Sequence, residues 1–393
     1  MRGGRAVDPE LLRSVRQKVL SAPGPVTAAG IAAAVKESGR VLGTTGTLAA
    51  MEVIAAELRG LGPLQPLAHD PAVTDIFVNG PHSVWVDRGR GLERAEIHFD
   101  SEEAVRSLAA RLIAAAGRRL DESSPCVDVR VAGGYRVHAV LQPVSTTGTL
   151  LSIRIRRERV FGLDELESSG TVLPEQRGVL EAIAASDASY LVSGATGTGK
   201  TTLLSTVLGL SRPEERIVLV EDAAELNPDH PHVLGLEARH GNLEGMGAID
   251  LAELVRQALR MRPDRLIVGE CRGAEVRELL TALNTGHSGA GTIHANSAGS
   301  VAARLAALGA LAGLSAEATA LQAASALGCV VHLARIPAGR RVASIAHVSE
   351  REGRLVIEPA LERDLRTDRL SRGPGWDGLE SLLSESASAR WGL

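Results

Sequence analysis

The 393-residue sequence predicts an α/β fold, preceded by a smaller α+β N-terminal domain. From Glu175 onward, short apolar runs alternate with helix-like runs, a pattern typical of a parallel sheet covered by helices. Before Arg156, short strands cluster around one helix candidate, which indicates an α+β arrangement. Finally, Gly194–Thr202 fits a phosphate-binding loop (P-loop) between an apolar strand and a helix.

The overall composition is that of an ordinary globular protein, with 44% apolar and 23% charged residues. Aromatic residues make up only 2%, so the core must consist of Leu, Val, Ile and Ala. The net charge of −4 gives no overall basic surface for nucleic acid. Three widely separated cysteines, Cys126, Cys271 and Cys329, indicate a reducing compartment and argue against a zinc site. We expect no signal peptide, because no apolar run follows Met1–Arg5, and no transmembrane segment, because no uncharged apolar run reaches the ~20 residues needed.

Breaks in the pattern divide the chain into five predicted segments. They are a helical extension at 1–45, the α+β domain at 46–156, a linker at 157–174, the α/β domain at 175–365 and a poorly ordered tail at 366–393. In the α+β domain, helices are predicted at 47–58 and 101–116, and strands at 73–78, 83–87, 91–98, 127–131, 135–141 and 150–156. Ser101 is the expected N-cap of the second helix. In the α/β domain, strands are predicted at 189–193, 216–221, 265–269 and 290–293, helices at 250–260 and 273–284, a helical pair at 299–327, and strand-like runs near 329–334, 341–348 and 354–358.

The most informative stretch reads G-A-T-G-T-G-K-T-T and fits the pattern G-x-x-x-x-G-K-[ST]. Its glycines let backbone N–H groups surround phosphates, Lys200 would reach the β- and γ-oxygens, and the Thr201 hydroxyl would hold Mg²⁺. The candidate nucleotide-binding residues are Gly194, Ala195, Thr196, Gly197, Thr198, Gly199, Lys200, Thr201 and Thr202. A dinucleotide-binding loop is disfavoured, because the glycine spacing is G-x-x-G-x-G and the Lys-Thr pair suits a triphosphate.

Carboxylates follow two further predicted strands. The run E-D-A-A-E spans Glu221–Glu225, and Glu270 ends the strand at 265–269, with Gly269 in the usual place of an aspartate. Acids at the carboxyl ends of parallel strands lie where Mg²⁺ and the attacking water would be. Thr201, Glu221 and Glu270 are therefore candidate Mg²⁺ ligands, partly through water. Glu270, or alternatively Glu225, is the candidate base for the water.

Histidines and arginines supply the remaining candidates. His287 and His294 flank a glycine-rich turn and strand that we place at the active edge, where His287 could sense the γ-phosphate and His294 could bridge to a neighbouring element. A structural role is an equal alternative for each histidine, and no third ligand supports a metal site. Arginine neutralises charge on a transferring phosphoryl group. The candidates are Arg256, Arg260, Arg262 and Arg265 in one group and Arg136, Arg154 and Arg156 in the first domain; a solvated surface role is the alternative.

These blocks, in this order, resemble the secretion ATPase superfamily of type II and type IV systems. Within it they are most similar to the TadA/CpaF and VirB11-like pilus-assembly and conjugal-transfer ATPases. The resembling blocks are the P-loop Gly194–Thr202, the Asp box Glu221–Glu225, the Walker B strand Leu266–Glu270, the His box Thr285–His294 and the lead-in Leu259–Arg265. The chain lacks the four-cysteine zinc module of many type II members, and its Asp box reads E-D-A-A-E rather than E-D-T/P-x-E.

The resemblance implies a flexible linker between the α+β domain and a RecA-like motor domain. It also implies a hexameric ring that binds ATP and Mg²⁺ between the two domains, at a subunit boundary. The functional residues that it implies are Glu270, Glu221 and Glu225, His287 and His294, and the phosphate-binding arginines Arg136 and Arg154. The implied protein is a cytoplasmic motor, peripheral to the inner face of the membrane, that acts on an inner-membrane pilus or secretion platform.

Two other functions stay open as alternatives to this ATP-hydrolysing motor. A DNA-transfer or helicase-like motor is disfavoured by the negative net charge and the scarcity of aromatic residues for base stacking. A non-enzymatic, nucleotide-gated scaffold is disfavoured because Lys200, Thr201, Glu225 and Glu270 are all present.

Overall fold

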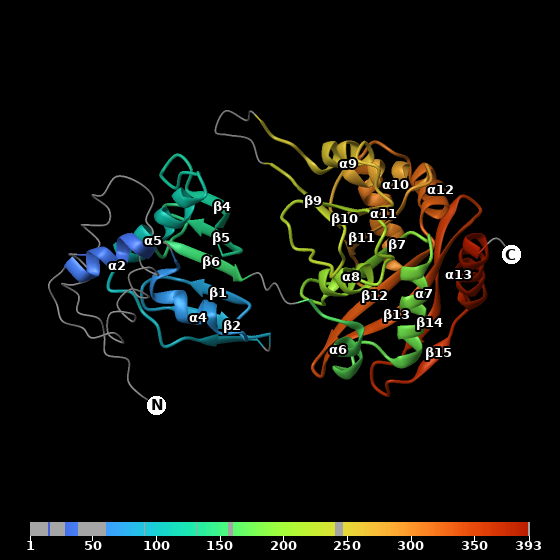
Figure 1. Ribbon diagram of the computed structural model, residues 1–393, viewed down its shortest axis with the longest axis horizontal. Helices are drawn as coiled ribbons and strands as arrows, with labels where there is room; N and C mark the ends of the chain where they lie inside the picture. The colour runs from blue at the N-terminus through green and yellow to red at the C-terminus, as the bar shows by residue number, and fades with distance from the viewer. Residues whose placement is uncertain are drawn as a thin grey trace. The chain divides into compact units, whose positions relative to one another are not determined.

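The computed structural model describes residues 15, 28–37, 60–89, 91–131, 133–155, 160–239 and 247–391. The chain forms two compact units, one up to Arg157 and one from Glu158 onward (Figure 1). Each unit has its own buried apolar core. The helix predicted at 47–58 lies outside the described residues, as does most of the predicted extension at 1–45.

The first unit contains a six-stranded antiparallel sheet with the order β3-β2-β1-β6-β5-β4. Its strands are β1 (Asp75–Val78), β2 (Val84–Asp87), β3 (Leu92–Arg94), β4 (Cys126–Val131), β5 (Tyr135–Val140) and β6 (Leu150–Ile155). Its described helices are α2 (Ala28–Glu37), the 3-10 turn η1 (Gly62–Leu64), α4 (Gln65–His69) and α5 (Glu102–Ala115). All six strands and helix α5 confirm the sequence prediction for this part of the chain.

Helix α5 covers the buried face of this sheet. Its N-cap is Ser101, whose Oγ accepts a hydrogen bond from the backbone N–H of Ala104 at 3.3 Å, as predicted. Its apolar side chains join the buried residues of the alternating strands in one core. On the other face, Arg130, Arg136 and Arg154 lie directly opposite one another across β4, β5 and β6. Three arginines thus form a row on this face of the sheet.

The second unit contains a nine-stranded mixed sheet with the order β15-β14-β13-β12-β7-β11-β10-β8-β9. Its strands are β7 (Tyr190–Gly194), β8 (Ile217–Glu221), β9 (Val233–Glu237), β10 (Arg265–Cys271), β11 (Ser288–His294), β12 (Cys329–Ile336), β13 (Gly339–Arg351), β14 (Arg354–Arg363) and β15 (Leu370–Arg372). The six strands from β9 to β12 are parallel, and β13, β14 and β15 continue the sheet in antiparallel pairs. This arrangement confirms the predicted α/β class.

Helices cover both faces of this sheet (Figure 1). One layer consists of α6 (Leu163–Ser168), α7 (Pro174–Ala185), α8 (Lys200–Leu208) and α13 (Trp376–Trp391). The other consists of α9 (Leu251–Leu259), α10 (Glu275–Leu283), α11 (Ser300–Leu311) and α12 (Ala316–Ala326). Tyr190 and Val192 of β7 pack in the first layer and Leu191 in the second, which is the two-residue period of a strand buried on both faces.

The structure differs from two predicted segments of the chain. In the predicted linker at 157–174, Leu163 and Leu166 of α6 are buried in the core of the second unit. The predicted poorly ordered tail instead forms β15 and α13. The polar composition of this tail gives no sign of the close packing that the structure shows. Gly378 packs against the ring of His347, since a Cβ on Gly378 would lie 2.6 Å from that ring. Leu379 beside this glycine is 1% exposed, so the first turns of α13 are part of the fold.

Within the described residues, no single helix has the length and apolar character needed to cross a membrane. Helices α11 and α12 satisfy that criterion only as a pair, with a bend of 119° between them.

Candidate active site

The P-loop connects the end of β7 at Gly194 to the start of α8 at Lys200, as predicted. Gly199 precedes the helix with a φ of 95°, a left-handed conformation that glycine adopts without strain. A Cβ on Gly194 would lie 2.6 Å from the carbonyl oxygen of Leu333, so this position also requires glycine. The loop therefore forms the open backbone cradle that a phosphate group needs.

Lys200 is buried, and its ammonium group lies against the loop. Nζ donates hydrogen bonds to the carbonyl oxygens of Gly194, at 3.1 Å, and Ala195, at 3.0 Å. Nζ also lies 3.4 Å from Nδ1 of His294. The loop thus holds a cation at the place where the sequence predicts the β- and γ-phosphates.

The parallel strands bring Glu270 and His294 to Lys200. Glu270 lies near the end of β10, and His294 ends β11 at the position paired with Gly194. Nε2 of His294 lies 2.7 Å from Oε1 of Glu270, while Arg272 donates from Nη2 to Oε2 of the same carboxylate at 2.6 Å. Lysine, histidine and glutamate therefore form a continuous polar chain at the carboxyl edge of the sheet, where ligands of α/β proteins bind.

Burial and neighbouring charges fix the protonation of this chain. Burial lowers the pKa of His294, Glu270 opposes this, and Lys200 adds to the lowering. His294 is therefore neutral near pH 7, and its contact with Glu270 is a hydrogen bond rather than an ion pair. Burial by itself would raise the pKa of Glu270, but the hydrogen bond and charge of Arg272, with His294 and Lys200, lower it overall. Glu270 is thus an ionised carboxylate that can accept a proton.

The first carboxylate of the acidic run is a backbone cap. Oε1 of Glu221 accepts hydrogen bonds from the backbone N–H groups of Glu225, at 2.8 Å, and Leu226, at 2.9 Å. Glu221 is 4% exposed, so these bonds offset the cost of burying its charge. Gly269 provides the space, because a Cβ there would lie 2.7 Å from Cγ of Glu221. A role for Glu221 in binding Mg²⁺ stays a prediction, with one carboxylate oxygen already engaged.

A magnesium site here would depend on phosphate and water. The described ranges contain no group of three or more His, Cys, Asp or Glu residues that could hold a metal ion by themselves. Mg²⁺ commonly binds through one or two protein oxygens together with substrate phosphates and water, so a dedicated protein cage is not required. Thr201, in the first turn of α8, and Glu270, beside Lys200, fit that mode of binding.

The placement of His287 at the active edge is wrong. His287 precedes the first residue of β11, Ser288, whereas His294 ends the strand beside Gly194. Seven residues of extended chain span about 20 Å, so the two histidines lie at opposite edges of the sheet. Within this unit, His287 lies 3.5 Å from Oγ1 of Thr285 and away from the P-loop. The predicted parallel strand at 290–293 already has residue 287 before its first residue and residue 294 after its last, so the prediction overlooked the direction of its own strand.

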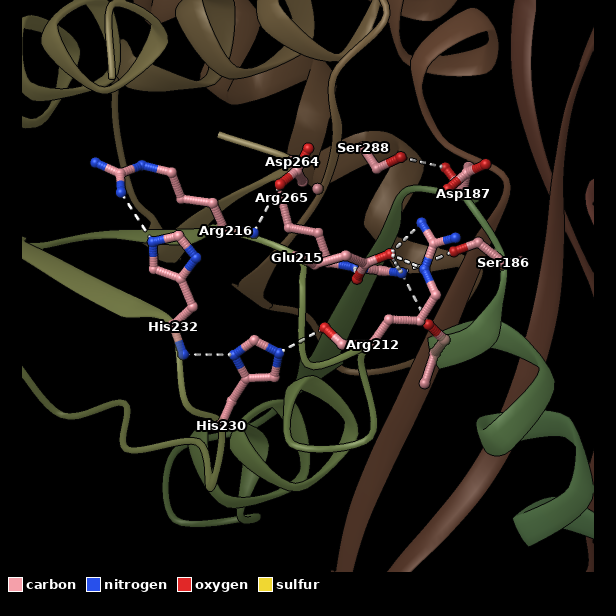
Figure 2. A network of polar contacts seen from close by, with 12 residues as sticks. Ser186, Asp187, Arg212, Glu215, Arg216, His230, His232, Asp264, Arg265 and Ser288 are labelled. Atoms are coloured by element: carbon pink, nitrogen blue, oxygen red, sulfur yellow. Dashed lines mark hydrogen bonds and ion pairs between the residues drawn. The ribbon is translucent and has the colours of Figure 1, made fainter. Parts of the chain in front are cut away.

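Arg265 also lies at the amino edge of the parallel strands (Figure 2). Arg265 begins β10 and is 2% exposed; its Nε lies 2.6 Å from Oε2 of Glu215, and its Nη2 donates to the carbonyl oxygens of Ala184 and Ser186. Arg216, before β8, donates to Nε2 of His232 at 2.9 Å in the same network. Arg265 is therefore a structural residue and not a phosphate ligand of its own P-loop.

The other candidate arginines belong to the first unit. Arg136 on β5 makes a bidentate ion pair with Asp128, with Nη2–Oδ2 at 2.7 Å and Nε–Oδ1 at 3.2 Å. Arg154 on β6 lies directly opposite Arg136, and Arg156 is outside the described residues. The role of Arg136 and Arg154 toward phosphates stays a prediction.

Sequence reasoning missed two groups of residues at this site. Arg272 was detectable, because it follows Glu270 by two residues and alternate residues of a strand end share a face. His332, Arg335 and Arg340 come from β12 and β13, and no local pattern connects those strands with the P-loop. Their proximity results from the parallel pairing of β12 with β7.

His332 links the P-loop strand to stability at acidic pH. Its Nδ1 lies 2.9 Å from Oγ of the buried Ser193, and burial, followed by the charge of Lys200, lowers its pKa. The folded protein therefore binds fewer protons than the unfolded chain, so stability is fully present above the unfolded pKa of about 6.5 and is lost as pH falls below it. As the pH is lowered from about 7.5 to 5.5, we expect the free energy of unfolding to fall less in His332→Gln than in wild type. Urea unfolding at each pH measures this. Burial also lowers the pKa of His294 and His347, which adds the same pH dependence to both proteins. Equal losses of unfolding free energy in wild type and His332→Gln would therefore contradict the role of His332.

Comparisons with known proteins place this geometry in a family. The chain is 51% identical over 359 residues to a Mycobacterium tuberculosis protein named "Putative conjugal transfer protein", covering 89% of this chain and all of that one. It is 31% identical over 291 residues to the conjugal transfer protein TrbB of Rhizobium radiobacter, covering 71% of this chain and 84% of that protein.

The fold also matches a solved structure. The crystal structure of the pilus retraction motor PilT with bound ADP matches with a TM-score of 0.55 and 21% identity, covering 85% of this chain and 89% of that one. The model of the family described as "Type II/IV secretion system protein" matches residues 57–362. This chain is therefore a member of the type II/IV secretion system protein family.

Proposed function

We propose that this protein is a Mg²⁺-dependent ATPase motor whose second unit is a RecA-like P-loop domain. The observation that carries the proposal is the meeting of Lys200, His294 and Glu270 at one phosphate-binding loop. A buried ammonium group beside an ionised carboxylate is the arrangement expected for hydrolysis of a phosphoanhydride. Membership of the type II/IV secretion system family supports the same reading.

ATP and Mg²⁺ are the ligands that the residues fit. The P-loop backbone would hold the phosphates, and Thr201 with Glu270 would hold Mg²⁺, which supplies neutralising charge when it is bound. Lys200 would exchange its bonds to the loop carbonyls for phosphate oxygens. Glu270 would orient the attacking water and accept its proton, while the hydrogen bond from His294 keeps the carboxylate in place. Glu225 is the alternative base.

The work done by this motor is proposed from the relatives. The M. tuberculosis and R. radiobacter relatives are named for conjugal transfer, which favours a secretion, conjugation or pilus-assembly machine, including one of the Tad type. We further propose a homohexamer on the cytoplasmic face of the inner membrane that acts on a membrane platform protein. In that assembly Arg136 and Arg154 would complete the phosphate site from the N-terminal domain.

The proposal is tested by the steady-state ATPase rate of the purified protein beside Lys200→Ala. We expect Mg²⁺-dependent turnover in wild type and a loss of at least about 10²-fold in the variant, because Lys200 supplies charge stabilisation in the transition state. Conjugal transfer in the names of relatives makes a nucleic-acid motor the second candidate. Turnover indifferent to single-stranded DNA supports the secretion motor, whereas strong stimulation favours the second candidate. Equal rates in wild type and Lys200→Ala would refute the assigned site.

A further inference from the structure

The hairpin of β12 and β13 extends past the end of the P-loop strand. β12 runs parallel to β7, and the last paired residues are Leu333 and Gly194. β7 ends there, but β12 continues to Ile336 before the chain turns into β13 at Gly339. The end of the hairpin is thus placed beside the P-loop rather than beside another strand.

Two arginines of this hairpin contact the loop. Arg340 donates from Nε to the carbonyl oxygen of Gly197 at 3.2 Å, and its Cδ lies 3.1 Å from where a Cβ on Gly199 would be. Nη1 of Arg335 lies 3.6 Å from where a Cβ on Gly197 would be. Gly197 has a φ of 74°, which favours glycine, and the 3.6 Å separation is that of ordinary van der Waals contact between the hairpin and the loop.

Arg335 and Arg340 are also directly opposite each other across the β12–β13 pair. Side chains at directly opposite positions share one face of a sheet, and like charges placed there destabilise the pair. Both arginines are exposed at the site. Two guanidinium groups on one face can contact the same anion, and arginine forms bidentate bonds with phosphate.

We propose that Arg335 and Arg340 form a second cationic wall of the nucleotide site and bind the phosphate chain where it emerges from the P-loop. This inference rests on the proposed nucleotide-binding function. The hydrogen bond from Arg340 to the carbonyl oxygen of Gly197 holds one peptide group of the loop against the hairpin. Lys200 and the loop amides would then hold the terminal phosphates, and the two arginines would contact the phosphate nearest the nucleoside.

The test is calorimetric titration of the full chain with Mg²⁺–ATP and, separately, with inorganic tripolyphosphate. We expect Arg335→Ala and Arg340→Ala to weaken binding of both ligands by roughly tenfold or more, the range for a hydrogen bond to a charged group. Arg335→Lys should recover part of the affinity. The matched control is Arg351→Ala, an exposed arginine at the far end of β13 that pairs with Glu358.

The outcomes separate this inference from the function on which it rests. Wild type that binds neither ligand overturns both. Binding by wild type that is unchanged in Arg335→Ala and Arg340→Ala overturns the cationic wall alone. Weakened binding of ATP with unchanged binding of tripolyphosphate also overturns it, because the arginines would then contact the base or ribose. Thermal unfolding checks that each variant is folded. If Arg340→Ala does not fold, Arg335→Gln is titrated in its place.

Discussion

Replacement of Glu270 by glutamine is expected to reduce ATP turnover by about 10²–10⁴-fold, the usual contribution of a general base. The amide keeps the shape of the side chain, and its single oxygen can accept the hydrogen bond from Arg272, but it cannot accept a proton from water. Binding of ATP should therefore be retained. Steady-state turnover and nucleotide titration of the same preparation measure the two effects separately.

Glu225→Gln is the matched control for this experiment. Glu225 lies after β8, and its backbone N–H is bound by Glu221. If Glu270 is the base, Glu225→Gln should retain most of the turnover. The reverse ranking, with turnover lost in Glu225→Gln and kept in Glu270→Gln, would transfer the catalytic role to Glu225.

Arg265→Ala is expected to lower the free energy of unfolding of the second unit by about 3–5 kcal/mol, because it breaks a buried ion pair. Arg265 is 2% exposed and Glu215 5% exposed, and the hydrogen bond from Arg265 opposes the effect of burial and lowers the pKa of Glu215 overall. Removal of the arginine leaves this carboxylate with Arg212 as its remaining ion-pair partner in Figure 2. Chemical denaturation monitored by circular dichroism provides the measurement.

Two variants control for causes other than the buried pair. Arg256→Ala removes an arginine that is 47% exposed and pairs with Glu253 and Glu278, so a change within about 1 kcal/mol is expected. The double variant Arg265→Met/Glu215→Met should be more stable than Arg265→Ala, because it removes the buried carboxylate together with the arginine. A double variant as unstable as the single one would show that packing, and not charge, dominates at this site.

Local sequence was sufficient to predict the P-loop, the strands of the first unit and the alternation of strands and helices in the second unit. In each case neighbouring residues determine the element, as with the N-cap Ser101 of α5. β9 was missed because it is an edge strand with partly buried residues and gives no continuous apolar run. The edges of His287 and Arg265 followed from the predicted parallel strands at 265–269 and 290–293, because residues at the start of such strands lie at the amino edge, but the motif-based prediction did not use this.

A different limit applies to contacts between distant segments. Arg340 reaches Gly197 through strands that are far apart in the sequence, and the contact of α13 with His347 depends on Gly378. Neither leaves a periodic pattern. The candidate site was therefore predictable where one strand and its following loop supply the residues, and not where two elements meet.

The close approach of Gly269 to Glu221 limits which side chains the two positions can hold. The two positions lie on adjacent strands and share one small volume, since a Cβ at 269 would lie 2.7 Å from Cγ of Glu221. An acid in place of Gly269 would require a shorter side chain at 221, and the turn after β8 would then need another acceptor for the N–H groups of Glu225 and Leu226. Positions 221 and 269 are thus sterically coupled, and we expect a single Gly269→Ala change to displace the Glu221 side chain from the turn that it caps.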